Sequence, residues 1–160
     1  MHGESCLADV ERPVREQLDA YNARDIERFM PWWADDCQYF AFPSTLLADG
    51  AAQIRERHVG RFREPHLHGA LVKRMVVGNL VVDQEVVTRT FPEGPGEVDV
   101  VAIYEVEAGK IAKAWFKLGQ RRMQQAHEVS DVFFHDLRIG ALQKRMGLLE
   151  GRFFERRLIF

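Results

Sequence analysis

Apolar residues recur at helical spacing near the start of the chain, and the spacing is then interrupted once. Two runs follow it, and the second begins after the sequence Ala23-Arg24-Asp25. The apolar positions of the two runs are Val10, Val14, Leu18 and Tyr21, then Ile26, Phe29 and Trp33. We therefore expect two helices joined by a short break.

A strand and a third helix are expected next. Residues 37–43 are rich in aromatic side chains and end at a proline, which is typical of a strand. Residues 50–63 carry Ile54, His58 and Phe62 on one helical face, and a proline shortly afterwards prevents the helix from continuing. The first part of the chain thus predicts the order helix, helix, strand, helix.

The apolar pattern then changes to the two-residue period of strands. The expected strands are 66–77, 80–91, 97–106 and 110–118. The first two are separated by Gly78-Asn79, a dipeptide typical of tight hairpin turns. Four consecutive strands predict an antiparallel meander. Together with the helices they indicate an α+β fold in which three helices lie on one face of a curved sheet.

The last forty residues differ from the rest. Residues 121–160 contain eight Lys and Arg against five Asp and Glu, whereas the whole chain has a net charge of −2. Apolar residues recur there at alternating spacings of three and four, at Ile139, Leu142, Met146, Leu149 and Phe153. We therefore expect residues 1–120 to form one domain and residues 121–160 to form an amphipathic helical arm.

Composition narrows the class of protein. The chain has 160 residues, 46% of them apolar, which suffices for one domain with a hydrophobic core. A net charge of −2 and a pI near 6.3 argue against nucleic-acid binding, which usually needs a basic surface. Cys6 and Cys37 form no paired motif, and no apolar run suits a signal peptide or a membrane span. We expect a cytoplasmic protein that binds neither nucleic acid nor membrane.

Alternation sorts the hairpin of residues 66–91 into two faces. If its two-residue turn is tight, residue i lies opposite residue 157−i. One face then carries the pairs His66/Phe91, His68/Arg89, Ala70/Val87, Val72/Glu85 and Arg74/Asp83. The other face is more apolar and carries Leu67/Thr90, Leu71/Val86, Lys73/Gln84, Met75/Val82 and Val77/Leu80. On pattern alone, the apolar face would be core and the two histidines would lie in solvent.

Three stretches of the sequence resemble one known family. The segment YNARDIERFMPWWADDCQYFAFP, residues 21–43, resembles the opening of the SnoaL-like, ketosteroid-isomerase-like branch of the NTF2-like superfamily. The segment GAAQIRERH, residues 50–58, is similar to the third helix of that family, and VDVVAIYEVEAGKIAKAWF, residues 98–116, is similar to its closing hairpin. The resemblance covers roughly residues 10–119.

The resemblance implies a cone of helices and curved sheet whose concave side is a ligand pocket and whose convex side often forms a homodimer. The positions that would line the pocket are Gln17, Tyr21, Tyr39, Ala41, His68, Glu85, Val87, Arg89, Ala102, Tyr104 and Phe116. On this interpretation the polar face of the hairpin lines the pocket and the apolar face is an interface. The interface would thereby cover an apolar patch that would otherwise be exposed.

The catalytic groups of ketosteroid isomerases are missing. Those enzymes use one carboxylate to move a proton, and a phenol with a protonated carboxylic acid to hold the oxyanion. At the matching positions this chain has Ala41 for the base, Gln17 for the phenol and Ala102 for the acid. We therefore do not expect steroid isomerisation by that mechanism.

A different polar set remains on the expected pocket face. His68 would act as general acid or base, Arg89 and Tyr104 would polarise or anchor a carbonyl group, and Glu85 would orient them. The arrangement resembles the dehydratase and dehydrochlorinase branches of the superfamily, which pair such a histidine with an aspartate. Here the nearest acid is Asp25, which could equally be a helix cap.

Two hypotheses of function follow. The first is a cofactor-independent enzyme of isomerase, cyclase or dehydratase type that transfers a proton on a small hydrophobic or carbonyl-containing ligand. The second is a non-catalytic ligand-binding or dimerisation module, which the missing carboxylates favour. A metal site at His66 and His68 would need a third ligand, and only His58 is near in sequence, so we expect no metal.

Overall fold

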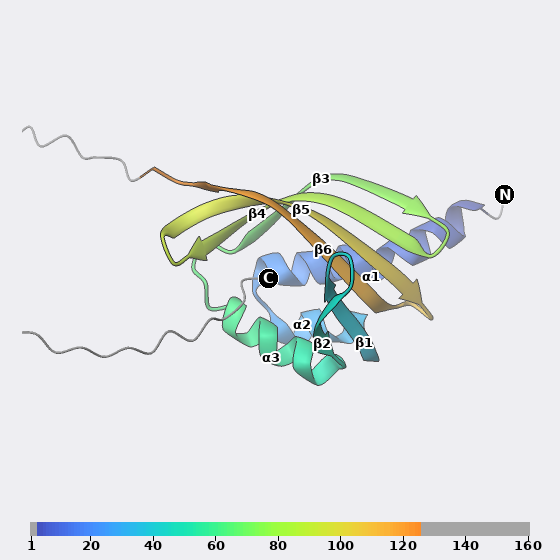
Figure 1. Cartoon of the computed structure of the whole chain (residues 1–160). Helices are drawn as coiled ribbons and strands as arrows, with labels where there is room; N and C mark the ends of the chain where they lie inside the picture. Colours follow the sequence, from blue (N-terminus) through green and yellow to red (C-terminus); the bar gives the residue numbers. More distant parts are fainter. Residues whose placement is uncertain (1–2, 126–160) are drawn as a thin grey trace, which may run out of the picture. The chain divides into compact units, whose positions relative to one another are not determined.

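The helical and alternating patterns fold into three α-helices and six strands within residues 3–125, the part of the chain that the computed structural model describes (Figure 1). The helices are α1 (Gly3–Ala23), α2 (Ile26–Phe29) and α3 (Ala51–Arg61), with a 3-10 turn, η1 (Met30–Trp32), after α2. The strands are β1 (Trp33–Ala41), β2 (Thr45–Asp49), β3 (His68–Val77), β4 (Leu80–Phe91), β5 (Gly94–Glu107) and β6 (Lys110–Met123). The helices lie on one face of the curved sheet, which confirms the predicted α+β cone.

The sheet is mixed rather than purely antiparallel. Its strand order within the described residues is β2-β1-β6-β5-β4-β3, and β1 runs parallel to β6. The antiparallel prediction was right for the meander β3 to β6 but missed this pairing, because α3 and the meander separate the two strands in sequence. The short edge strand β2 was not predicted. Strand β6 also continues to Met123, past the boundary expected after residue 120.

The core lies between α1 and the inner face of the sheet. On α1, Val14 and Leu18 are buried at the spacing that the sequence predicts, and Ala20 is buried as well. The buried apolar residues of the central strands alternate with outward residues and include Val81, Val87, Val98, Val100, Ala102, Val106, Ile111 and Ala114. Each fully buried valine or leucine side chain contributes about 1.5–3 kcal/mol. The strand period of two therefore fixes which side chains face the helices.

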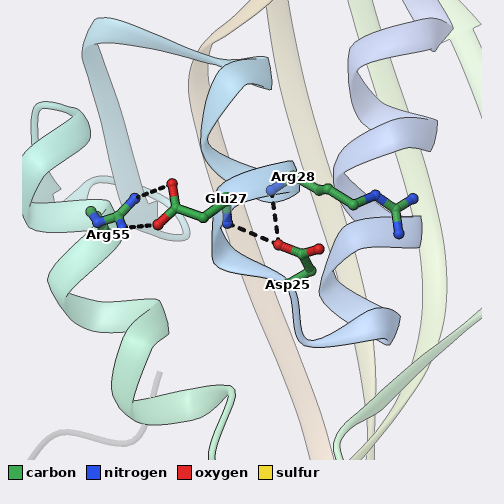
Figure 2. Close-up of polar contacts among 4 residues, drawn as sticks. All are labelled: Asp25, Glu27, Arg28 and Arg55. Carbon is green, nitrogen blue, oxygen red and sulfur yellow. Dashed lines mark hydrogen bonds and ion pairs between the residues drawn. The ribbon is translucent and has the colours of Figure 1, made fainter.

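The break between α1 and α2 is stabilised by Asp25. One carboxylate oxygen of Asp25 accepts hydrogen bonds from the backbone N–H groups of Glu27 at 3.0 Å and Arg28 at 3.1 Å (Figure 2). Asp25 is thus the cap of α2, which is one of the two alternatives left open by the sequence. The Glu27 carboxylate turns away and pairs with Arg55 of α3 at the surface.

The β3–β4 hairpin contains a β-bulge at Val72. From Lys73 to Val77 the partners follow the predicted 157−i register around the Gly78-Asn79 turn, but the register shifts by one between Leu71 and Lys73. A single extra residue moves every side chain before it to the opposite face of the sheet. The predicted faces are therefore correct after the bulge and reversed before it.

The reversal changes the surroundings of His68. It lies opposite Thr88 rather than Arg89, and it is exposed. The residues that turn inward instead are Leu67 and Gly69, both of which are buried. Leu67 was expected on the apolar outer face, so that prediction was wrong for the same reason.

The predicted arm falls almost wholly on residues 126–160, which lie outside the described residues. No helix within residues 3–125 has the length and apolar character needed to span a membrane.

Candidate functional site

Polar side chains interrupt the apolar inner face where α1 faces β4 and β5. Gln17 of α1, Asp83 and Glu85 of β4, and Tyr104 of β5 are all buried there. Burial of a polar group costs free energy unless the group finds a hydrogen-bond partner. The partners of these four side chains therefore decide what the inner face can do chemically.

Asp83 is fully buried and ion-paired. The guanidinium of Arg74 donates from Nε and Nη2 to the two carboxylate oxygens of Asp83, each at 2.7 Å. The side chains of Arg74 and Asp83 are 11% and 0% exposed. Hydrogen bonding to Asp83 raises the pKa of Arg74, so the guanidinium stays charged. Both oxygens of Asp83 are thus occupied by a fixed partner.

Glu85, two residues further along β4, is buried without such a partner. Its side chain points to the same face as Asp83 and the residue is 5% exposed. Within the described part of the chain, its Oε1 is buried and has no hydrogen-bond partner. Burial, and secondarily the charge of Asp83, raise the pKa of Glu85 to about 7, against a smaller opposing effect of Arg74. Glu85 is therefore a carboxyl group that titrates near neutral pH.

Gly69 allows α1 to approach the Glu85 carboxyl group. A β-carbon added at Gly69 would lie 3.0 Å from Leu18 Cδ1, 3.6 Å from Glu85 Oε2 and 3.7 Å from Asn22 Oδ1. Asn22 also clamps this position, because its side chain donates to the Gly69 carbonyl at 2.9 Å and accepts from the Gly69 N–H at 2.7 Å. The bulged start of β3 is thereby fixed against the end of α1, beside Glu85.

Tyr104 supplies a phenol to the same region. The amide nitrogen of Gln17 donates to its hydroxyl oxygen at 3.3 Å. Burial, and then the charges of Glu85 and Asp83, raise the pKa of Tyr104 well above 10. Since Gln17 provides the hydrogen of their bond, the phenolic hydrogen of Tyr104 remains available to another acceptor.

Aromatic side chains flank the polar group. The Tyr39 ring of β1 stacks on Phe116 of β6 with ring centroids 4.3 Å apart, and Phe116 meets Tyr104 edge-on at 5.8 Å. Tyr21 of α1 contacts Phe62 edge-on at 5.6 Å. The other positions expected on this face, Ala41, Val87 and Ala102, are also buried. The ligand-binding positions expected from the sequence thus share the inner side of the domain.

Arg89 and His68 do not join the group. Arg89 donates from Nε to Glu64 at 3.2 Å and from Nη2 at 2.5 Å, and Glu64 also accepts from the Thr90 N–H at 3.0 Å. These bonds hold the α3–β3 loop against β4, so the expected pairing of Arg89 with His68 was wrong. Among residues 3–125, neither His66 nor His68 belongs to a group of three potential metal ligands.

Comparison with known proteins identifies the family. The family model described as the SnoaL-like domain matches residues 14–114. The chain belongs to the SnoaL-like domain family. No curated protein matches the sequence significantly.

Solved structures share the fold of this SnoaL-like domain. An uncharacterized cystatin-fold protein from Novosphingobium aromaticivorans is 26% identical, with a TM-score of 0.62 over 68% of this chain and 97% of that one. An NTF2-like protein from Cytophaga hutchinsonii is 13% identical, with a TM-score of 0.59 over 69% and 89% of the two chains. An LEH-like epoxide hydrolase from M. tuberculosis is 14% identical, with a TM-score of 0.63 over 71% and 84%. The last two show similarity of fold alone.

Three polar residues of α3 were not identified as functional candidates from the sequence. His58 was assigned to the apolar face of the helix, and it is buried, with Nδ1 donating to the Ile54 carbonyl at 2.8 Å. Burial, and then the charge of Arg61, lower the pKa of His58 to about 3. Arg57 and Arg61 follow Ile54 by three and seven residues and so share its face. Extending the apolar stripe to its polar members would have found both arginines.

Proposed function

We propose that this SnoaL-like domain binds a small molecule with a carbonyl group on its inner face and that Glu85 exchanges a proton with it. The observation that carries the proposal is the state of Glu85. Its carboxyl group is buried, Oε1 has no hydrogen-bond partner among residues 3–125, and burial raises its pKa to about 7. A group that titrates near the working pH is populated in both forms, so it can take and return a proton.

The proposed reaction moves one proton between Glu85 and the substrate and needs no other reactant. The Glu85 carboxylate removes a proton from the carbon next to the substrate carbonyl. The electron pair of the broken C–H bond forms a C=C bond, and the π pair of the carbonyl group moves to the carbonyl oxygen. Tyr104 donates a hydrogen bond to the resulting oxyanion. The Glu85 carboxylic acid then returns the proton. In a β,γ-unsaturated substrate the proton returns to the γ-carbon as the carbonyl group re-forms, which gives isomerisation. In a β-hydroxy substrate the proton goes to the departing hydroxyl group as the carbonyl group re-forms, which gives dehydration.

The neighbours of Glu85 support these roles. The raised pKa of Tyr104 keeps the phenol protonated, and Gln17 occupies a lone pair of its oxygen rather than its hydrogen. The Arg74–Asp83 pair is already satisfied, so it serves as a fixed charge that tunes Glu85. In this proposal the ligand is bound by Gln17, Tyr21, Tyr39, Ala41, Val87, Ala102 and Phe116. The Tyr39–Phe116 stack offers a flat apolar wall for an unsaturated ligand.

A non-catalytic ligand-binding module is the second candidate. It is favoured by Ala41 and Ala102, which stand where the ketosteroid-isomerase resemblance would require carboxyl groups. On this alternative Glu85 remains protonated and only donates a hydrogen bond to a bound ligand.

Hydrogen–deuterium exchange on a bound ligand separates the two candidates. A set of carbonyl, steroid and polyketide-like compounds is first screened by thermal shift, and each stabilising compound is then incubated with the protein in D2O. The enzyme proposal predicts exchange at the carbon next to the carbonyl, slowed by roughly 100-fold or more in Glu85→Gln. Glu105→Gln, whose side chain lies on the outer face of β5, is the matched control and should leave the rate unchanged. Binding without exchange in the wild-type protein would reject the enzyme and retain the binding module.

We also propose that the outer face of the sheet forms a homodimer. Met75 and Val77 of β3 are 52% and 63% exposed, and Val101 of β5 is 40% exposed. Val82 and Ile103 lie opposite each other on the same face. An exposed apolar sheet face of this kind is a liability for a monomer and is well suited to pack against a second copy of itself.

A further inference from the structure

The inner face of α3 carries two arginines, Arg57 and Arg61, near the Tyr39 ring. Ile54, Arg57, His58 and Arg61 follow the spacing of one helical face, and Ile54 and His58 are buried. Arginine at such a position is unusual unless its guanidinium has something to bind. A different side of α3 carries Arg55, which pairs with Glu27 at the surface (Figure 2).

Arg57 is held against Tyr39 with a donor unused. Its Cζ lies 5.3 Å from the centroid of the Tyr39 ring, a cation–π contact. Among the described residues, the Nε of Arg57 is buried and has no hydrogen-bond partner. Arg57 as a whole is only part-buried. Burial lowers the pKa of Arg57, which a bound anion would reverse.

Arg57 lies among other positive charges: after burial, the charges of Arg61 and Arg89 also lower its pKa. Burial first, and then the charges of Arg61, Arg57 and Arg89, lower the pKa of the neighbouring His58. The carboxylate of Glu64 already binds Arg89. Among residues 3–125, Arg57 has no carboxylate partner of its own.

A second buried donor lies near the Tyr39 ring. The Trp33 ring is 6.1 Å from Tyr39, and within residues 3–125 its Nε1 is buried with no hydrogen-bond partner. An N–H donor can be satisfied only by an acceptor, and a guanidinium binds a carboxylate through two parallel hydrogen bonds. The stacked Tyr39 and Phe116 rings beside these donors favour a flat ligand.

We propose that Arg57 binds the carboxylate of a planar unsaturated acid that lies against Tyr39. This proposal extends the proposed function. It rests on that function in one respect only, namely that the other end of the ligand faces Glu85. Tyr21 is within range of charges at both ends: after burial, the charges of Arg61, Arg89 and Glu85 act on the pKa of its hydroxyl group. Its ring also contacts His58 edge-on at 6.4 Å.

Sodium benzoate and uncharged benzamide provide the test, because they share ring and size but differ in charge. Binding is followed by the NMR signals of the backbone and of the Arg57 Nε–H group, up to the solubility limit of each probe. We expect benzoate to shift the Arg57 Nε–H signal and to bind at least about 10-fold more tightly than benzamide. Equal binding of the two probes, or no shift with benzoate, would overturn the proposal.

Three variants assign the effect to Arg57. Arg57→Gln should weaken benzoate binding by about 10-fold or more, and Arg57→Lys, which keeps the charge but not the fork of donors, should weaken it less. Arg55→Gln, on the outer side of the same helix, should bind as the wild type does. If Arg57→Gln unfolds, the benzoate affinity of Arg57→Lys and the shift of the wild-type Arg57 Nε–H signal still test the proposal. Loss of binding in Arg55→Gln as well, or in neither variant of Arg57, would contradict the assignment.

The outcome is distinguishable from that of the proton-transfer proposal. Glu85→Gln should retain benzoate binding, because the anion binds at the other end of the inner face. Benzoate binding to both the wild type and Glu85→Gln, with no exchange activity on any ligand, would leave the anion site standing and reject only the catalytic role of Glu85.

Discussion

Glu85 and Asp83 lie two residues apart on the same buried face of β4, yet only Asp83 has a charged partner. Arg74 binds both oxygens of Asp83 at 2.7 Å, whereas Oε1 of Glu85 has no hydrogen-bond partner within residues 3–125. The fixed Asp83 charge adds to the effect of burial and raises the pKa of Glu85. This relationship places a titrating carboxyl group inside the domain.

The pH dependence of stability should report Glu85. Its folded pKa of about 7 lies above the ordinary value of 4.5, so between these values the folded state binds more protons than the unfolded state. The contribution of Glu85 to the free energy of unfolding is therefore greatest at low pH. It falls by a total of about 3 kcal/mol as pH rises through about 7. Glu85→Gln cannot titrate, so urea unfolding should show its stability rising relative to the wild type from about pH 4.5 to about pH 8. A constant difference across that range would reject the raised pKa.

The Asn22 clamp should be worth a measurable amount of stability. Asn22→Ala loses both hydrogen bonds to the backbone of Gly69, and we expect a loss of about 1–3 kcal/mol in chemical unfolding, with faster hydrogen exchange at the Gly69 amide. Gln84→Ala, an exposed position on β4, should change stability by less than about 0.5 kcal/mol. Equal effects of the two substitutions would argue that the clamp has no special role.

Arg89 should matter for stability rather than for binding. The Arg89–Glu64 pair is largely buried, with side chains 14% and 16% exposed. A double-mutant cycle with Arg89→Gln and Glu64→Gln should therefore give a coupling energy of about 1–3 kcal/mol. Benzoate should bind the folded double variant as tightly as it binds the wild type. Loss of benzoate binding together with negligible coupling would restore Arg89 as a ligand anchor.

The outer face of the sheet should control self-association. We expect the wild-type protein to sediment as a dimer and the variant with Met75→Lys and Val101→Lys to sediment as a monomer, because each charge would have to be buried in the interface. Glu107→Lys, at the exposed end of β5, is the control and should remain a dimer. A monomeric wild type, or a dimer that survives both lysines, would contradict an interface on this face.

Local patterns predicted most of the secondary structure but not every contact. The helical spacing of Val14 and Leu18, and the Gly78-Asn79 turn, are local signals that tertiary packing did not override. The parallel pairing of β1 with β6 depends on residues more than sixty positions apart, and nothing in either strand alone encodes it. Strand β2 is short and lies at the sheet edge, where the apolar alternation is weak.

The same distinction explains the site. Glu85 and Tyr104 lie on the inner face as expected, because alternation is uninterrupted along β4 and β5 over these residues. His68 lies on the other face because of the bulge at Val72, and valine carries no signal of a bulge, since it fits a regular strand equally well. Arg89 was predicted to pair with His68 on β3, but its partner is Glu64 in a loop. Strand alternation gives no information about contacts with loops.

The central claim is that Glu85 titrates near neutral pH inside the domain, and a carbon-13 NMR titration of its carboxyl group tests this most directly. The wild-type signal should have a midpoint near 7, and Asp83→Asn should lower it, because the substitution removes a charge that raises the pKa. A wild-type midpoint near 4.5, or a midpoint that Asp83→Asn leaves unchanged, would contradict the account.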